Sequence, residues 1–96
     1  MVINIIGLIW NEWNIIHIAR HDITQVEVEE VCQNNPVIEQ GKKGRLLIIG
    51  FTFTSRAITA ILDPEDQEGI YYPVTARPAS RRERKIYEYK KSGGEN

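Results

Sequence analysis

Seven lysine and arginine residues lie between residues 77 and 91, where only two glutamates oppose them. They are Arg77, Arg81, Arg82, Arg84, Lys85, Lys90 and Lys91. The guanidinium group binds phosphate and carboxylate oxygens through paired N–H donors. A net charge of +5 over this stretch therefore predicts an anion-binding site, for phosphate or for acidic side chains. The open alternative is a solvated basic helix face.

The arginines surround a junction at which a predicted strand gives way to a helix. Ser80 and Glu83 have the spacing of a capping box, which puts the start of the helix beside Arg81. Backbone amides at a helix N-terminus attract anions, whereas arginines at that position oppose the helix dipole. A bound phosphate would offset this repulsion. In the alternative interpretation, Glu83 caps the helix and pairs with a neighbouring arginine.

A second candidate is the pair Arg20 and His21, at the end of the first predicted helix. Histidine can exchange a proton near neutral pH, so His21 could act as a general acid or base. The alternative is a hydrogen-bonded histidine at a helix end. His17 lies four residues before His21, but the acidic residue of a HExxH zinc site is missing. We expect no metal and no cofactor.

These residues must be positioned by a small α+β fold. Helices are predicted over 11–20 and from Thr24 to about 34, the second with a Thr24–Glu27 capping box. Strands are predicted over 45–53, 57–62 and 70–76, with a short addition at 37–39 and a final helix from residue 80. We expect an antiparallel sheet of three to four strands packed with two N-terminal helices and one C-terminal helix. Pro73 indicates a sheet edge or a bulge, and Gly50 a bulge or a close approach.

The 96 residues are enough for one domain, which we place over 1–91 with a flexible tail at 92–96. The apolar run over 1–10 is too short to cross a bilayer and is predicted to be a buried strand or helix lead-in. Cys32 is the only cysteine, which suits a reducing cytosol, and we expect a cytoplasmic protein without membrane contact. The net charge of −1 does not by itself favour nucleic acid.

The two candidate regions resemble the BrnT family of small toxins. Family members begin with a tryptophan-led helix that ends in a basic residue, histidine, glycine and an aliphatic residue. Residues 10–14 (WNEWN) and 20–23 (RHDI) are similar, with Asp22 in place of the glycine. Residues 76–87 (ARPASRRERKIY) match the family's closing pattern A-R-x-A-[ST]-R-x-E-R-x-x-Y.

The resemblance implies a RelE-like fold and the toxin of a type II toxin–antitoxin pair, which cleaves RNA without a metal. It implies catalytic roles for His21, Arg77, Arg81 and Tyr87. RNA-binding roles are expected for Arg20, Arg82, Arg84 and Lys85. Glu83 also matches, and we expect it to cap the helix. The implied partners are RNA and a BrnA-like ribbon-helix-helix antitoxin. The expected assembly is a homodimer of the toxin or a toxin–antitoxin heterotetramer.

A rival hypothesis is a non-catalytic interaction module. In that case the protein keeps a toxin fold, and its arginines dock acidic side chains of a partner. A neighbouring gene for a ribbon-helix-helix protein would favour a toxin–antitoxin pair. Direct DNA binding by the basic helix is a third hypothesis, which would require a steep salt dependence and operator specificity.

Overall fold

The computed structural model describes residues 3–94, which form one five-stranded sheet and three α-helices. In chain order the elements are β1 (Gly7–Leu8), α1 (Glu12–Ala19), α2 (Gln25–Gln33), β2 (Val37–Gln40), the 3-10 turn η1 (Lys42–Gly44), β3 (Leu46–Phe51), β4 (Ala57–Pro64), β5 (Ile70–Pro78) and α3 (Arg81–Lys91). The α+β class is as expected. Within residues 3–94, no helix is long and apolar enough to cross a membrane.

The expected sheet of three to four antiparallel strands is wrong in number and in direction. The strand order is β1-β5-β4-β3-β2, and β1 runs parallel to β5, so the sheet is mixed. Pairing extends slightly beyond β1, because the Ile6 and Ile9 amides donate to the Gly69 and Tyr71 carbonyls at 2.7 and 2.9 Å. A two-residue strand carries no alternating pattern, so its distant partner strand is invisible in the sequence. The remaining positions of the lead-in, residues 1–2, lie outside the described residues.

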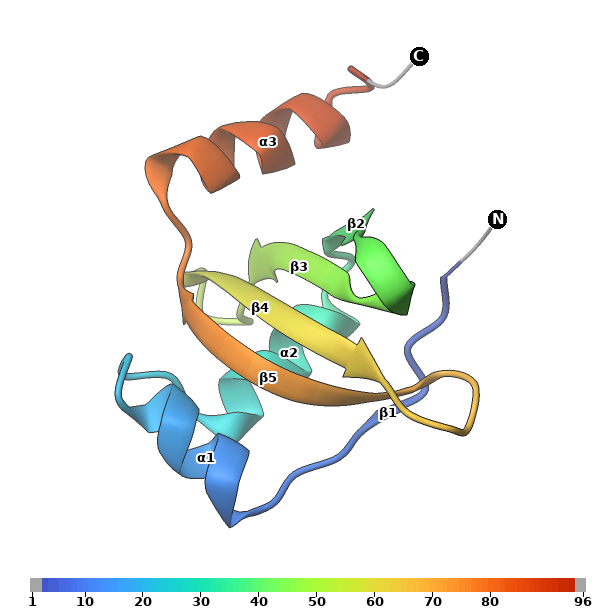
Figure 1. The fold of residues 1–96 in the computed structure, drawn as a ribbon. Helices are drawn as coiled ribbons and strands as arrows, with labels where there is room; N and C mark the ends of the chain where they lie inside the picture. The colour runs from blue at the N-terminus through green and yellow to red at the C-terminus, as the bar shows by residue number, and fades with distance from the viewer. Residues whose placement is uncertain (1–2, 95–96) are drawn as a thin grey trace.

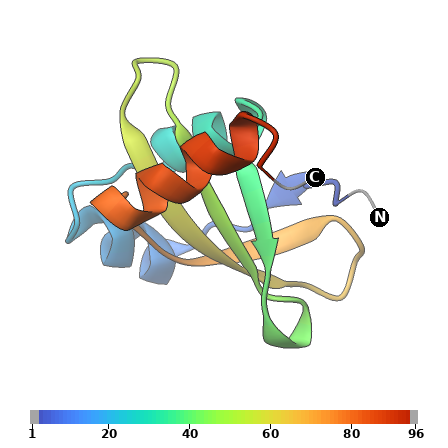
Figure 2. The ribbon, with the colours of Figure 1, turned by 90° about the horizontal axis from the view of Figure 1, so that it is seen from above.

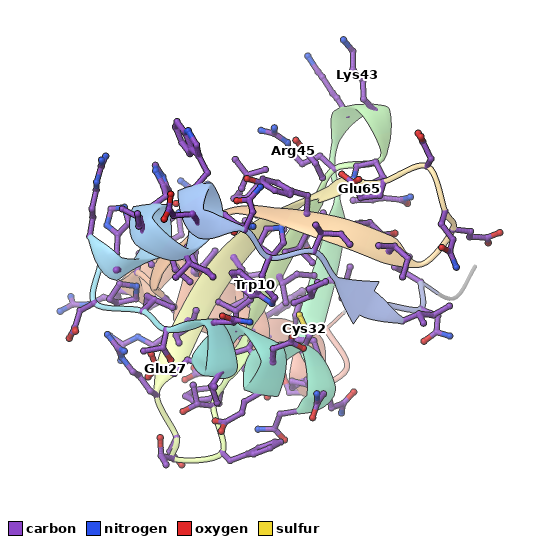
Figure 3. The ribbon with its side chains drawn as sticks, turned by 90° about the horizontal axis from the view of Figure 1, so that it is seen from below. Trp10, Glu27, Cys32, Lys43, Arg45 and Glu65 are labelled. Carbon is purple, nitrogen blue, oxygen red and sulfur yellow. The ribbon has the colours of Figure 1, made fainter. Side chains whose placement is uncertain are left out.

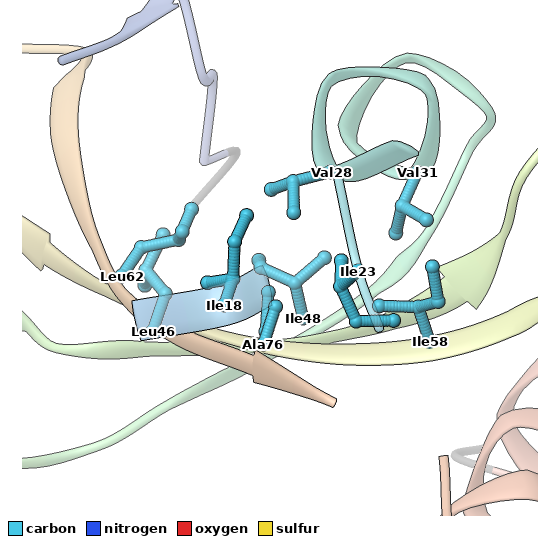
Figure 4. Packing of buried hydrophobic residues seen from close by; sticks show 10 residues of the cluster. Ile18, Ile23, Val28, Val31, Leu46, Ile48, Ile58, Leu62 and Ala76 are labelled. Atoms are coloured by element: carbon cyan, nitrogen blue, oxygen red, sulfur yellow. The ribbon is translucent and has the colours of Figure 1, made fainter. Parts of the chain in front are cut away.

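The helices are divided between the two faces of the sheet. Figure 1 shows α1 and α2 below the sheet and α3 above it, and Figure 2 shows α3 crossing the near face. The hydrophobic core lies between the sheet and the first two helices (Figure 4). Its buried side chains are Ile18, Ile23, Val28, Val31, Leu46, Ile48, Ile58, Ala60, Leu62 and Ala76. No residue of α3 is fully buried, so the third helix covers the other face more loosely.

Side-chain caps determine where the first two helices begin. The Thr24–Glu27 capping box at α2 is confirmed, and α1 has a second one in which Asn11 and Asn14 accept each other's backbone amides. The buried Asn14 side chain also donates to the Ile9 and Pro73 carbonyls at 3.0 and 3.1 Å. The bond to Pro73 fastens the start of α1 to β5. The capping role of Asn14 was not predicted, because the standard box has Glu or Gln at this position.

Pro73 and Gly50 each disturb or constrain the sheet in a way that the sequence suggested. Around Pro73 the pairing of β4 with β5 shifts register, which is the predicted bulge. Strand β5 lies between β1 and β4, but β1 pairs only with Ile70 and Tyr71, so Pro73 has no partner strand on the β1 side among the described residues. At Gly50 the pairing is regular and the close approach is confirmed, since an added Cβ would lie 3.1 Å from Pro36 and Val31 side-chain atoms.

The described part of the predicted tail is hydrogen-bonded to α3. The Ser92 hydroxyl donates to the Glu88 carbonyl at 2.9 Å, and the Gly94 amide donates to the Tyr89 carbonyl at 2.9 Å. The positive φ angle of Gly93 (82°) helps this turn to close. Residues 95–96, the rest of the predicted tail, lie outside the described residues.

Candidate functional site

The junction between β5 and α3 is built around the carboxylate of Glu83. Two guanidinium nitrogens of Arg77, on β5, donate to its two oxygens at 2.7 and 2.6 Å. The Ser80 amide and the Thr59 hydroxyl donate to the same carboxylate at 2.8 and 2.9 Å. Thr59 and Arg77 are register partners on β4 and β5, so both reach α3 from the same face of the sheet. The predicted capping role of Glu83 is confirmed.

Glu83 remains ionised at any ordinary pH. The hydrogen bonds from Arg77 lower its pKa to about 2, against the opposing effect of desolvation, and bonds from Ser80 and Thr59 add to the lowering. The pKa of Arg77 is correspondingly raised by the same carboxylate. Arg77 therefore lies at the predicted junction, but two of its nitrogens are already bound to Glu83. A phosphate at this position would have to share the guanidinium with that carboxylate.

A free group of cations occupies the first half of α3. We call it the basic cluster, and it consists of Arg81, Arg82, Arg84 and Lys85. All four residues are exposed, and within residues 3–94 their side chains have no hydrogen-bond or ion-pair partner. The backbone amides of Arg81 and Arg82, in the first turn of α3, likewise have no acceptor among these residues. Two amide donors and four cations are thus available together at this helix end.

Tyr87 lies further along α3 and holds the helix against the sheet. Its ring meets Phe51 of β3 edge-on, with 5.1 Å between the ring centroids. The Lys91 ammonium lies 5.5 Å from the centre of the Tyr87 ring and donates to the Asn35 carbonyl at 2.6 Å. Tyr87 is half-buried, so its contacts in the structure are those of a packing residue.

His21 lies at the same end of the sheet as the basic cluster but on the opposite side. The shared end follows from two bonds: Arg56 donates to the Asp22 carbonyl at 2.7 Å, and the Ala79 amide donates to the Ala57 carbonyl at 3.0 Å. Figure 1 shows α1 and α3 on opposite faces of the sheet, and Arg20 and His21 follow directly after the last residue of α1. The structure brings Arg77 to the base of the cluster and does not bring His21 to it.

The surroundings of His21 are open. Its exposed ring meets that of His17 edge-on at 6.1 Å, and His17 stacks on Trp13 at 6.2 Å. No group of three His, Cys, Asp or Glu residues that could hold a metal occurs in the described part of the chain. Arg20 is exposed beside His21.

The other residues of the tryptophan-led segment have different surroundings. The Trp10 indole donates to Glu29 of α2 at 2.8 Å, and Figure 3 shows Trp10 lying over α2 near Cys32. Trp10 is therefore a packing residue. Burial raises the pKa of the half-buried Cys32 thiol to about 12, with a further contribution from Glu29. Cys32 is therefore a small packing residue on α2.

Sequence reasoning missed Thr59 as the third donor to Glu83. Its only signal is a polar residue within an apolar strand, residues 57–62 (AITAIL), and such a threonine is common in strands. It also missed the exposure of Trp13 and Ile16 on α1. An apolar residue at helical spacing usually faces the core, so the sequence alone favoured burial.

A scan against models of protein families, a search of curated proteins and a search of solved structures found no match to this chain. The functional argument therefore depends on the residues and their arrangement.

Proposed function

We propose that the protein is an RNA-directed toxin of the BrnT type, with a RelE-like fold, and that the basic cluster on α3 is its phosphate-binding surface. The observation that carries the proposal is the set of four exposed, unpartnered cations within the first five residues of α3, as far as residues 3–94 show. Four like charges on neighbouring helical turns repel one another and oppose the helix dipole. A polyanion relieves both penalties, and RNA supplies regularly spaced phosphates.

The junction is suited to holding phosphate in a fixed position. Arg77 and Glu83 lock the start of α3 onto β5, so Arg81 and Arg84, three residues apart, project from a firmly attached turn. The free amides of Arg81 and Arg82 add short donors that need no side-chain ordering. In this arrangement Arg77 is a positioning residue, and Arg81 and Arg84 are the groups that contact RNA. Arg82 and Lys85 extend the same basic surface.

The proposed reaction is metal-independent cleavage of RNA. The ribose 2′-oxygen attacks the adjacent phosphorus, the bond to the 5′-oxygen breaks, and a 2′,3′-cyclic phosphate and a 5′-hydroxyl result. One proton leaves the 2′-hydroxyl and one reaches the 5′-oxygen, and His21 would carry out one of these transfers. Arginine would stabilise the negative charge that grows on the phosphate. In the free protein His21 and Arg81 lie on opposite sides of the end of β5, so this reaction requires the two groups to meet at one phosphate in the RNA complex.

A second candidate is RNA or protein binding without cleavage. The observation that favours it is the placement of His21 on the opposite side of the sheet from Arg81. General acid–base catalysis requires the proton-transfer group and the charge-stabilising groups within about 3 Å of the reacting atoms. In this alternative the basic cluster docks phosphates or the acidic side chains of an antitoxin.

The test is induced expression of the chain in a bacterium, with growth and RNA integrity followed in the same culture. We expect growth arrest with RNA degradation, and we expect the Arg81→Ala/Arg84→Ala variant to relieve both. The matched control is Lys42→Ala/Lys43→Ala, which removes two exposed cations at the other end of the sheet. Arrest that persists unchanged in the Arg81/Arg84 variant would overturn the proposal.

The His21→Ala variant separates the two candidates. Loss of RNA degradation, with soluble folded protein and retained RNA affinity, would support a proton-transfer role. If the wild-type protein instead arrests growth while the RNA stays intact, the result would favour binding without cleavage. A small adjacent gene encoding a ribbon-helix-helix protein that prevents the arrest when co-expressed would support the expected antitoxin.

A further inference from the structure

The outward side of α1 carries an exposed apolar surface that the proposed function does not use. We call it the α1 outer face, and it consists of Glu12, Trp13, Ile16, His17 and Arg20, which line a shallow hollow of about 310 Å³. Figure 1 shows α1 at the periphery of the molecule, with its inner side towards β5 and α2. The hollow therefore opens to solvent on a helix whose other side is already packed.

Two large side chains in the centre of this face have little cover. Trp13 is 74% exposed and Ile16 is 52% exposed, although Ile18 on the inner side is fully buried. Trp13 is held in place by its stacking on His17, with the two ring planes 20° apart. Single exposed apolar residues are ordinary, but an ordered tryptophan beside an exposed isoleucine is typical of interfaces.

The charges at the two ends of the face are opposite and symmetrically placed. Glu12 and Arg20 are eight residues apart, about 12 Å along the helix, and Ile16 lies midway between them. Both side chains are exposed, and neither has a hydrogen-bond or ion-pair partner within residues 3–94. The helix dipole explains an acid at the start and a base at the end. It does not explain the apolar side chains exposed between them.

We propose that the α1 outer face binds the same face of a second copy of this chain, with the two α1 helices antiparallel. A two-fold axis at Ile16 brings Glu12 of each copy beside Arg20 of the other, because Glu12 lies four residues before Ile16 and Arg20 lies four residues after it. The two isoleucines then meet at the axis and the tryptophans cover its flanks. A face that matches itself under a two-fold rotation is the requirement for a symmetric homodimer.

The charge balance favours a second copy over RNA as the occupant. One carboxylate and one guanidinium cancel on the α1 outer face, and the Asp22 carboxylate just after it pairs with Arg56 at 3.9 Å. A polyanion would therefore meet no excess of positive charge there, whereas the basic cluster on α3 offers four free cations. A single short helix covers much less than the roughly 800 Å² per partner of a standard interface, so we expect a weak dimer with a micromolar Kd.

The experiment measures the molar mass of the full-length protein by sedimentation velocity between about 1 and 500 µM. We expect a concentration-dependent shift from monomer to dimer in the wild type, and monomer throughout for Ile16→Glu. Glu12→Arg and Arg20→Glu should each weaken self-association by about tenfold, because each places like charges opposite one another twice per dimer. Glu65→Arg, a charge reversal on the β4–β5 loop, is the control and should dimerise normally.

The decisive measurement mixes the two charge variants. On the α1 outer face the Glu12→Arg copy carries two bases and the Arg20→Glu copy carries two acids. An equimolar mixture of the two variants should therefore form a heterodimer at least as tight as the wild-type dimer. Circular dichroism checks that each variant is folded.

Two results would overturn the dimer. One is a wild-type protein that is monomeric at every concentration, and the other is a mixture of the charge variants that stays monomeric. A loss of RNA affinity in Trp13→Ala without any dimer would assign the face to RNA instead.

Discussion

At the residue scale, Glu83 explains much of the motif that first drew attention to this region. It accepts hydrogen bonds from a strand arginine, a strand threonine and the N-cap amide of its own helix. Its side chain is only 12% exposed, so these donors replace water almost completely. The A-R-x-A-S-R-x-E pattern therefore describes the attachment of a helix to a strand as much as a site for a ligand.

This network makes a prediction about acid stability. The pKa of Glu83 is about 2 when folded and near its ordinary value of 4.5 when unfolded. The folded state therefore binds this proton more weakly, so the stabilisation is present above pH 4.5 and is lost as the pH falls towards 2. The measurement is urea unfolding of wild type and Glu83→Gln between about pH 6 and pH 2.5. At pH 6 the free energy of unfolding of Glu83→Gln should be roughly 1–2 kcal/mol below that of the wild type, a range that allows for solvent screening at the half-exposed Arg77.

The difference between the two proteins should shrink as the pH falls from 4.5 towards 2, because Glu83 then takes up a proton in the unfolded state and the ionised form no longer favours folding. Glu88→Gln, on the exposed side of the same helix, is the control and should leave the pH profile unchanged. Parallel profiles for wild type and Glu83→Gln would contradict the assignment.

Asp22 shows what a single departure from a family pattern can mean in the backbone. The resembling family has glycine here, and Asp22 adopts a left-handed conformation with φ of 61°. Glycine enters this region at little cost, and aspartate is among the side chains that tolerate it. A glycine could therefore adopt the same turn between α1 and α2, and Arg56 reinforces the turn by donating to the Asp22 carbonyl.

At the element scale, α3 differs from the other two helices in how it is held. Polar contacts fix its ends: Arg77 binds Glu83, and the Lys90 ammonium lies 3.1 Å from Glu39. Between them, Tyr87 on Phe51 is the main aromatic contact. By contrast, α2 buries Val28 and Val31 completely. The helix that carries the basic cluster is therefore the one with the weakest hydrophobic attachment.

We predict that α3 opens locally before the rest of the fold. In hydrogen–deuterium exchange, amides of α3 should be less protected than those of α2, and Tyr87→Ala should lower α3 protection further by about tenfold to a hundredfold. Protection in α2 should change much less, because its core contacts do not involve Tyr87. Equal loss of protection in both helices would show that α3 unfolds only together with the core.

The sequence could predict the elements that depend on local contacts and not those that depend on distant ones. Capping boxes and strand patterns are local, so Thr24, Ser80 and the three main strands were recognised from their neighbours along the chain. The pairing of β1 with β5 and the Thr59–Glu83 bond depend on residues far apart in sequence, so no local pattern reveals them. For the candidate site, spacing located the basic cluster. The alternative interpretation, in which Glu83 caps the helix and pairs with an arginine, is confirmed by the Arg77–Glu83 pair. Spacing could not show which arginine forms the pair, or that His21 lies on the other side of the sheet.

At the scale of the whole molecule, the total charge of −1 hides a local excess of positive charge. The basic cluster holds four exposed cations at one end of the sheet, whereas the other end carries both the acids of the β4–β5 loop and the cations Lys42 and Lys43. A polyanion is attracted to such a local excess even when the total charge is slightly negative. Total charge is therefore a poor guide to whether this protein binds nucleic acid.

The final prediction concerns the salt dependence of RNA binding. Single-stranded RNA releases about 0.7 counterions for each phosphate that is neutralised, so contact through four cations gives log Kd a slope of about 3 against log salt concentration. Fluorescence anisotropy with a labelled single-stranded RNA would measure this slope between about 50 and 300 mM KCl. Arg81→Ala/Arg84→Ala should reduce it by about 1.4, whereas Lys42→Ala/Lys43→Ala should leave it within error. A slope that falls equally in both double variants would mean that RNA is attracted by diffuse charge, and the basic cluster would lose its assigned role.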